Sequence, residues 1–357
     1  MKIALLGDIL FSGKFCVNTN PDVYSYFKKV ADHLKQYDYV VGNLETPFVS
    51  NQKPFSAKSA HVKSDVENIS LLRYLNISIV NLANNHIYDF GKGSLDLTKS
   101  LLSKNNIQYF GVDDKQVFLN DSVASVAFHG YCCYSTNPFG LDCGVNKLDV
   151  TKVMNLSKEN DSNGMLNIIS VHSGQEHIHT PDYNLVRMAR QFAEECPYVF
   201  YGHHPHVIQS MEEYKKSLIA YSLGNFCIDE VYTSKSPKPI FVPSEYNKRS
   251  FILALDINED GLSSYEVIPI YIGENEIRIG DTNILQDIKE YSEELNKDVP
   301  TYKQERQDKI NRYIESRKAL RDLNWYIKRL NYNSVKQIIA TKKNFKLYKQ
   351  YVINKLL

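Results

Sequence analysis

The sequence predicts an α/β domain that contains parallel β-sheet and is followed by a helical extension. Three observations carry this prediction. Short apolar runs rich in Val, Ile and Tyr recur along the chain, and each ends in a polar turn. Segments with helical periodicity lie between them, and strands that alternate with helices are typical of parallel sheet. Beyond about residue 281 the periodicity is helical only.

The predicted strands are, in chain order, Ile3–Leu6, Tyr39–Val41, Ile77–Leu82, Leu166–Val171, Tyr198–Tyr201 and Leu218–Ser222. The helices predicted between them are Val23–Gln36, Asp65–Leu75, Ser94–Asn105 and Leu185–Glu195. Alternating strands Phe251–Ile257 and Tyr265–Ile272, separated by Glu259-Asp260-Gly261, predict a hairpin. The later helices are Asn283–Asn296, Thr301–Leu330 and Ser334–Leu357. We therefore predict a domain over residues 1–280 and an extension over residues 281–357.

Composition narrows the class of protein. A chain of 357 residues fits one large domain with an appendage, and 43% hydrophobic with 23% charged residues is ordinary for a soluble protein. The net charge of +1 gives no reason to expect nucleic acid as a specific partner. The six cysteines show no C-x-x-C spacing, which favours reduced thiols. No run reaches the ~20 apolar residues of a membrane span, so we expect a cytoplasmic protein.

The extension is basic near its end. No acidic residue follows Asp322, whereas Lys328, Arg329, Lys336, Lys342, Lys343, Lys346, Lys349 and Lys355 do. We expect helices that pack on the domain and display a solvated basic face. The alternative is peripheral contact with a membrane surface or an anionic polymer.

Histidines cluster where two predicted strands end. Gly202-His203-His204-Pro205-His206 places imidazoles two residues apart on an extended turn, which favours a metal site over packing. His172 stands first after its strand, and Gly174 permits a sharp turn. Farther along that loop lie His177 and His179, for which a solvated role is at least as probable as a functional one.

Carboxylates and amides follow the other strands. Asn85 can ligate a cation, His86 can donate a proton to a leaving group, and Asp89 can hold that imidazole in one tautomer. Asp8 and Glu45 also come directly after strands. Taken singly, these residues could mark a turn, a helix cap and a surface carboxylate. Their conjunction at strand ends predicts one site instead.

A ligand set of imidazole, carboxylate and amide without thiolate suits manganese, iron or zinc. Two such ions roughly 3.5–4 Å apart would activate water and neutralise charge on the substrate. Glu45 is our candidate for the bridging ligand, and His86 for the group that protonates the leaving group.

These motifs resemble the CapA family, named for capsule and poly-gamma-glutamate biosynthesis, whose fold belongs to the calcineurin-like metallophosphatase superfamily. The matching segments, in the family's order, are Gly7-Asp8, Asn43-Leu44-Glu45, Ala83-Asn84-Asn85-His86 with Asp89 and Gly91, His172-x-Gly174-x-Glu176, Gly202-His203-His204-Pro205-His206-Val207 and Tyr221-Ser222-Leu223-Gly224-Asn225-Phe226. They span roughly the first three quarters of the chain.

The resemblance implies a metallophosphatase-like αββα sandwich, with two β-sheets flanked by helices. By position, Asp8 and His206 correspond to ligands of one metal; Asn85, His172 and His204 to ligands of the other; and Glu45 lies between them. The other motif residues assigned to substrate are Asn43, Glu176, His203 and Asn225. Two departures are Leu10, where the superfamily pattern has His, and Ser173, where the family commonly has an aromatic residue.

The resemblance implies a hydrolase acting on a phosphoester, or on a related acyl or amide bond, of a surface polymer or its precursor. The alternative is a component of capsule assembly that keeps the fold and binds polymer without turnover. The intact ligand set favours the first, and Leu10 leaves room for the second.

Overall fold

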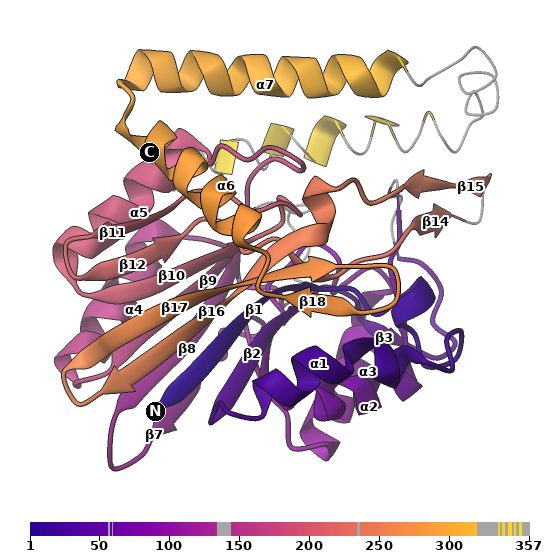
Figure 1. Cartoon of the computed structure of the whole chain (residues 1–357), viewed down its shortest axis with the longest axis horizontal. Helices are drawn as coiled ribbons and strands as arrows, with labels where there is room; N and C mark the ends of the chain where they lie inside the picture. Colours follow the sequence, from indigo (N-terminus) through magenta and orange to yellow (C-terminus); the bar gives the residue numbers. More distant parts are fainter. Residues whose placement is uncertain are drawn as a thin grey trace.

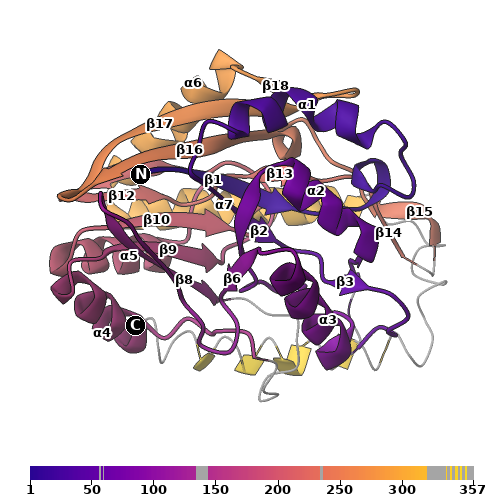
Figure 2. The same cartoon turned by 90° about the horizontal axis from the view of Figure 1, so that it is seen from below.

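The structure, a computed structural model, describes residues 1–55, 58, 60–133, 144–233 and 236–319, with scattered positions between 335 and 351. Two β-sheets are stacked in the centre, and helices cover both outer faces (Figure 1). Seen from below, α4 and α5 flank one sheet while α1, α2 and α3 flank the other (Figure 2). The predicted αββα sandwich is confirmed.

The first sheet has eight strands in the order β18-β17-β16-β1-β2-β5-β6, with β13 also paired to β1. Its strands are β1 Lys2–Ile9, β2 Tyr39–Leu44, β5 Ile77–Asn81, β6 Gln108–Phe110, β13 Asn225–Cys227, β16 Arg249–Asn258, β17 Gly261–Ile272 and β18 Ile277–Ile279. Strands β1, β2, β5 and β6 run parallel, and β16 pairs antiparallel with β1. The carboxyl ends of the parallel strands therefore meet at one edge.

The second sheet has the order β11-β12-β10-β9-β8-β7. Its strands are β7 Val117–Asn120, β8 Ser125–Cys132, β9 Leu166–His172, β10 Tyr198–His203, β11 Met211–Tyr214 and β12 Ser217–Ala220. The central strands β8, β9, β10 and β12 are parallel. Two small sheets pair β3 Phe48–Val49 with β4 Ser64–Asp65, and β14 Val231–Thr233 with β15 Ser236–Phe241.

Alternation along the strands explains the layers. In β1, Ile3 and Leu5 point into the core between the sheets, while Ala4 and Leu6 pack under the helices. Successive strand side chains point to opposite faces, so a continuous apolar run serves a sheet that is covered on both sides. In β10, Val199 likewise faces the core between the sheets.

The helices are α1 Val23–Leu34, α2 Ile69–Tyr74, α3 Gly91–Lys104, α4 Val150–Ser162, α5 Tyr183–Glu195, α6 Thr282–Glu293 and α7 Val299–Ala319. Helix α1 buries Val23, Phe27, Val30 and Leu34, an apolar stripe at helical spacing. Asn106 follows α3 with a φ of 56°, a conformation that asparagine tolerates and that ends a helix.

The predicted strands, the 251–272 hairpin and most helices are present. Helix α2 is shorter than predicted because Val66–Asn68 forms a separate 3-10 turn. The sequence interpretation did not include β6, β7, β8 or α4. Of the extension, α6 and α7 are described, whereas most of the basic segment lies outside the described residues. No helix in the described part of the chain is long and apolar enough to span a bilayer.

Candidate metal centre

The predicted polar residues converge where parallel strands of both sheets end. In the first sheet, Asp8 lies opposite both Asn43 and Asn225 in the strand register. In the second sheet, His172 lies opposite His203. Strand pairing therefore places these side chains without help from loops, as expected at the carboxyl edge of a parallel sheet.

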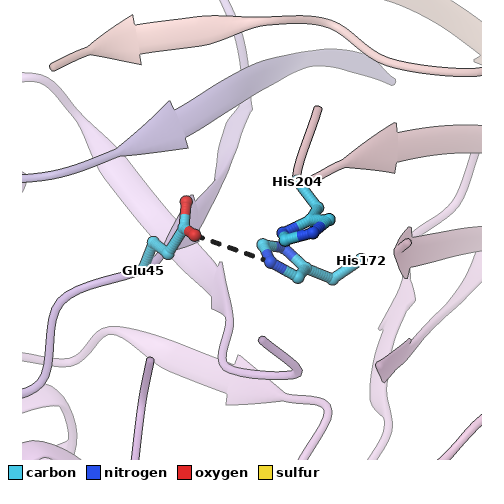
Figure 3. A group of neighbouring side chains, drawn as sticks. All are labelled: Glu45, His172 and His204. Atoms are coloured by element: carbon cyan, nitrogen blue, oxygen red, sulfur yellow. Dashed lines mark ion pairs between the residues drawn. The ribbon is translucent and has the colours of Figure 1, made fainter. Parts of the chain in front are cut away.

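Two groups of buried side chains offer atoms close enough to hold a cation. One is Glu45, His172 and His204, and the other is Asp8, Glu45 and His206; within each, the ligand atoms lie within 4.8 Å of one another. Glu45 is common to both. Figure 3 shows the Glu45 carboxylate directed toward the His172 ring, beside His204.

The turn after β10 adopts a conformation that L-residues rarely take. His204 has a φ of 95° and His206 a φ of 56°. Such backbone costs about 1–3 kcal/mol per residue and persists where the surrounding structure enforces it. Before the turn, Gly202 approaches Tyr221 so closely that a Cβ would lie 1.8 Å from the Tyr221 carbonyl oxygen. The turn is thus fixed by close backbone packing as well as by its histidines.

Asp8 is a buried carboxylate surrounded by donors. Asn43 Nδ2 donates to its Oδ1 at 2.8 Å, His203 Nδ1 lies 2.9 Å from the same oxygen, and His206 Nδ1 lies 3.3 Å from Oδ2. Burial alone would raise the pKa of Asp8, but His203 and His206 hold it well below its ordinary value. Asp8 is therefore ionised, as a metal ligand must be.

Glu45 is in the opposite situation. It is fully buried, and neither carboxylate oxygen has a hydrogen-bond partner among the described residues. Its Oε1 lies 3.5 Å from His172 Nε2 and 3.7 Å from His206 Nε2. Burial, reinforced by Asp8, raises its pKa well above the ordinary value. A buried carboxylate without a hydrogen-bond partner costs free energy. Cations held by the His172–His204 group and the Asp8–His206 group would satisfy its oxygens. The donor set fits a metal.

The imidazoles divide into two electrostatic types. Burial, with His204 adding to it, lowers the pKa of His172 well below its usual range. Burial also lowers the pKa of His204 to about 4. Neutral imidazoles are the form that ligates metals. Burial opposes the charge on His206, but Glu45 and Asp8 outweigh it and raise its pKa to about 10. In the metal-free chain, a protonated His206 balances the charge of Asp8.

His86 is held by Asp89, which also forms a buried ion pair with Lys58. Its Nδ1 lies 2.8 Å from Asp89 Oδ2, which also accepts from the Val62 amide at 2.9 Å. Lys58 donates to the other Asp89 oxygen and, at 2.9 Å, to the carbonyl of Asn85. Despite burial, His86 and Lys58 keep the pKa of Asp89 low. Asp89 can therefore fix the His86 tautomer, with Nδ1–H donating to it.

The remaining predicted residues surround these groups. Asn85 Oδ1 lies 2.7 Å from His172 Nε2. Asn225 accepts from His206 Nδ1 at 2.9 Å and donates to the His206 carbonyl at 2.9 Å. Asn43, His203 and Asn225 are fully buried, so here they contact ligand side chains. Glu176 is half-exposed at the edge of the site, with its Oε2 4.0 Å from His177 Nε2. All the predicted site residues are thus brought to one region.

Three residues of the site were missed by the sequence interpretation. Lys58 supports Asp89, Asn81 donates to Asn43 Oδ1 at 3.1 Å, and Asn247 donates to the His206 carbonyl at 2.8 Å. Asn81 carried a signal, because an amide inside an apolar strand must find a buried partner. Lys58 lies in an irregular segment and Asn247 in the short 3-10 turn Tyr246–Lys248, where one sequence gives no comparable signal.

Comparison with known proteins gives a consistent result. A family model described as "Bacterial capsule synthesis protein PGA_cap" matches residues 2–230. The capsule biosynthesis protein CapA of Bacillus anthracis is 27% identical over 297 residues, covering 77% of this chain and 68% of that protein. The PGA biosynthesis protein CapA of Bacillus subtilis (strain 168) is 27% identical over 288 residues, covering 77% and 72%. Among solved structures, 5'-nucleotidase from Candida albicans SC5314 aligns with a TM-score of 0.43 and 11% identity, covering 87% of this chain and 58% of that chain.

Proposed function

Because this chain belongs to the bacterial capsule synthesis family PGA_cap, we propose that it is a metal-dependent hydrolase of capsule or poly-gamma-glutamate biosynthesis. Its proposed substrate is a phosphoester, or a related acyl or amide bond, of the surface polymer or its precursor. The observation that carries the proposal is Glu45, a fully buried carboxylate without a hydrogen-bond partner among the described residues, which is shared by the His172–His204 group and the Asp8–His206 group. Burying this carboxylate costs free energy, and a chain that only bound polymer would gain nothing in return.

In this proposal Asp8 and His206 would hold one cation, Asn85, His172 and His204 would hold the other, and Glu45 would be available as a ligand to each. Manganese, iron or zinc bound here supplies Lewis acidity and a nucleophile at neutral pH. Asn43 and His203 orient Asp8 from behind, and Asn225 orients His206. These contacts fix the ligands before substrate arrives, which limits reorganisation during the reaction.

His86 is proposed to carry the leaving-group proton on Nε2. Its Nδ1 is committed to Asp89, so only Nε2 is free to face substrate. The Asp89 carboxylate stabilises the charged imidazolium, and Lys58 prevents Asp89 from turning away. This ordering of donor and carboxylate suits general acid catalysis.

A polymer-binding role in capsule assembly, without turnover, is the second candidate. Leu10 favours it, because the superfamily pattern has a histidine there and this leucine lies in the hydrophobic core. Asp8 instead contacts the imidazole of His203 at 2.9 Å. The two candidates differ in whether added metal gives turnover.

We also propose that the protein works in the cytoplasm. Cys16, Cys196 and Cys227 are buried free thiols, which is usual where thiols are kept reduced.

Elemental analysis of the purified protein, beside hydrolysis of bis(p-nitrophenyl) phosphate with added manganese, iron or zinc, tests the proposal. We expect about two equivalents of metal and turnover, both lost in the variant His204→Ala, His206→Ala. His33→Ala, on the outer helix α1, is the matched control and should retain both. Protein that takes up no metal and stays inactive would sink the hydrolase proposal and leave polymer binding as the better account.

A further inference from the structure

Helix α7 docks on the loop that leads into the metal centre. Tyr302 Oη donates to the Pro181 carbonyl at 2.8 Å, Arg306 Nε to the Thr180 carbonyl at 3.2 Å, and Lys309 Nζ to Thr180 Oγ1 at 2.7 Å. Positions 302, 306 and 309 share one face of a helix. This face is polar and aromatic rather than apolar, and it is anchored to the segment between β9 and α5.

The same face continues for two further turns, to positions 313 and 317. The Tyr313 ring lies 5.2 Å from the His177 ring, and Phe241 of β15 stacks on His177 at 5.4 Å with an interplanar angle of 15°. Arg317 Nη2 donates to the Ile240 carbonyl at 3.3 Å. Helix α7 and β15 thus both contact the ring of His177.

His177 connects this group with the proposed metal ligands. Its amide donates to the Pro205 carbonyl at 2.8 Å, and its ring centroid lies 6.5 Å from that of His206. Asn247 Nδ2 lies 3.0 Å from His177 Nδ1 and donates to the His206 carbonyl. We call Tyr313, Arg317, His177 and Phe241 the outer rim. It is a direct outward continuation of the centre.

The charge of the outer rim points to an anion. Arg317 is exposed, and no carboxylate among the described residues lies within ion-pair distance of its guanidinium. The Glu176 carboxylate lies 4.0 Å from His177 Nε2, on the side of the metal centre. A guanidinium presents a planar fork of N–H donors that matches carboxylate and phosphate groups.

We propose that the outer rim is a substrate subsite that binds an anionic group, carboxylate or phosphate, on the unit next to the bond at the metal centre. The inference rests on the proposed function for the direction in which substrate lies. It also assigns a role to α7, which follows the region that the family model matches.

Fluorescence anisotropy of a fluorescein-labelled γ-glutamate decamer, titrated with the full-length chain at low salt, tests the subsite. Arg317→Glu should weaken binding about tenfold, because it reverses the charge that meets the anion. Arg312→Glu is the matched control: it makes the same change on an exposed position of α7 and should alter binding less than about twofold. Unlabelled tripolyphosphate as competitor separates a phosphate preference from a carboxylate preference.

A similar loss in both variants would mean that only the general field of the helix matters, and would overturn the subsite. No effect of Arg317→Glu, or no binding of either probe by the wild-type chain, would overturn it as well. Because anisotropy reads binding, the result is independent of turnover. Arg317-dependent binding would keep the subsite even if the chain took up no metal and did not hydrolyse bis(p-nitrophenyl) phosphate, the outcome that refutes the hydrolase proposal.

Discussion

The metal centre and the outer rim are adjacent, yet they are built differently. The centre takes Asp8, His172 and His203 from strands whose register fixes their positions, and all three are fully buried. The rim takes Tyr313 and Arg317 from a helix held by side-chain hydrogen bonds. The centre lies inside the segment that the family model matches, and α7 follows it.

This difference in construction indicates separate roles for the two regions, with the reaction at the metal centre and the choice of substrate at the outer rim. Strand ends in a packed sheet cannot shift without disturbing the core between the sheets, so the centre suits the proposed reaction. A helix on the surface can change its contact residues at little cost to the fold. We therefore expect catalytic power to reside in the centre and substrate preference in the rim. The following predictions test this division, from the largest expected effect to the smallest.

Lys58→Met should have the largest effect, because it removes one member of a fully buried ion pair. Asp89 would keep its charge without its cation, and the loss of unfolding free energy should be about 3–5 kcal/mol. Urea denaturation measures it, with the exposed Lys53→Met in the same loop as control. A loss below about 1 kcal/mol would show that His86 and Val62 suffice to hold Asp89.

Glu45→Gln should separate function from stability within the centre. The buried carboxyl of Glu45 has no hydrogen-bond partner among the described residues, so its removal should leave the metal-free chain as stable or more stable. Turnover should fall about 10²–10³-fold, equivalent to about 3–4 kcal/mol. Thermal unfolding with and without manganese, beside initial rates, tests both parts. A strongly destabilised metal-free variant would mean that Glu45 has a structural role instead.

The pH dependence of stability should contain a contribution from a residue that lies outside both the metal centre and the outer rim. His129, buried in β8 between Tyr131 and Asn167, has its pKa lowered by burial to about 4. Between pH 6.5 and 4 the unfolded chain binds a proton that the folded chain does not, so stability falls as pH falls, by up to about 3 kcal/mol. His129→Gln cannot take that proton and should flatten this part of the curve from urea denaturation. An unchanged slope would assign the acid sensitivity to the histidines of the centre.

Tyr302→Phe should have the smallest effect. It removes the hydrogen bond to the Pro181 carbonyl but keeps the buried ring, so it should cost about 1 kcal/mol. Weaker anchoring of α7 should also weaken binding of the γ-glutamate decamer by about twofold. Turnover of bis(p-nitrophenyl) phosphate, which is too small to span both regions, should be unchanged. A large fall in that turnover would show that α7 supports the centre itself.

Much of the centre could be predicted from the sequence because its residues follow apolar runs. Asp8, Glu45 and His172 each come at or directly after a strand, and parallel strands bring such positions to one edge. The same rule explains why β8 was missed. Ser125–Cys132 contains His129 and Gly130, which interrupt the apolar pattern, although both are buried.

The rim could not be predicted in this way. For His177 a solvated role was at least as probable as a functional one, yet its ring stacks on Phe241 and lies 5.2 Å from the ring of Tyr313. Helix α7 has an almost uniformly polar sequence, so periodicity of apolar residues does not reveal its docking face. Contacts between surface elements far apart in the sequence depend on tertiary structure, which the pattern of a single sequence does not reveal. The basic segment after Asp322 lies mostly outside the described residues, so its polymer or membrane contact stays a prediction.

Strand β16 has a consequence for what can fold on its own. It pairs with β1 along Lys2 to Leu5, and its Phe251 and Leu253 fill the core between the sheets, yet it begins 19 residues after the recognisable family segment ends at residue 230. A fragment cut at that boundary would expose an apolar strand edge, which invites aggregation. The segment matched by the family model therefore lacks a strand that the core needs. Expression of residues 2–230 alone should yield insoluble protein.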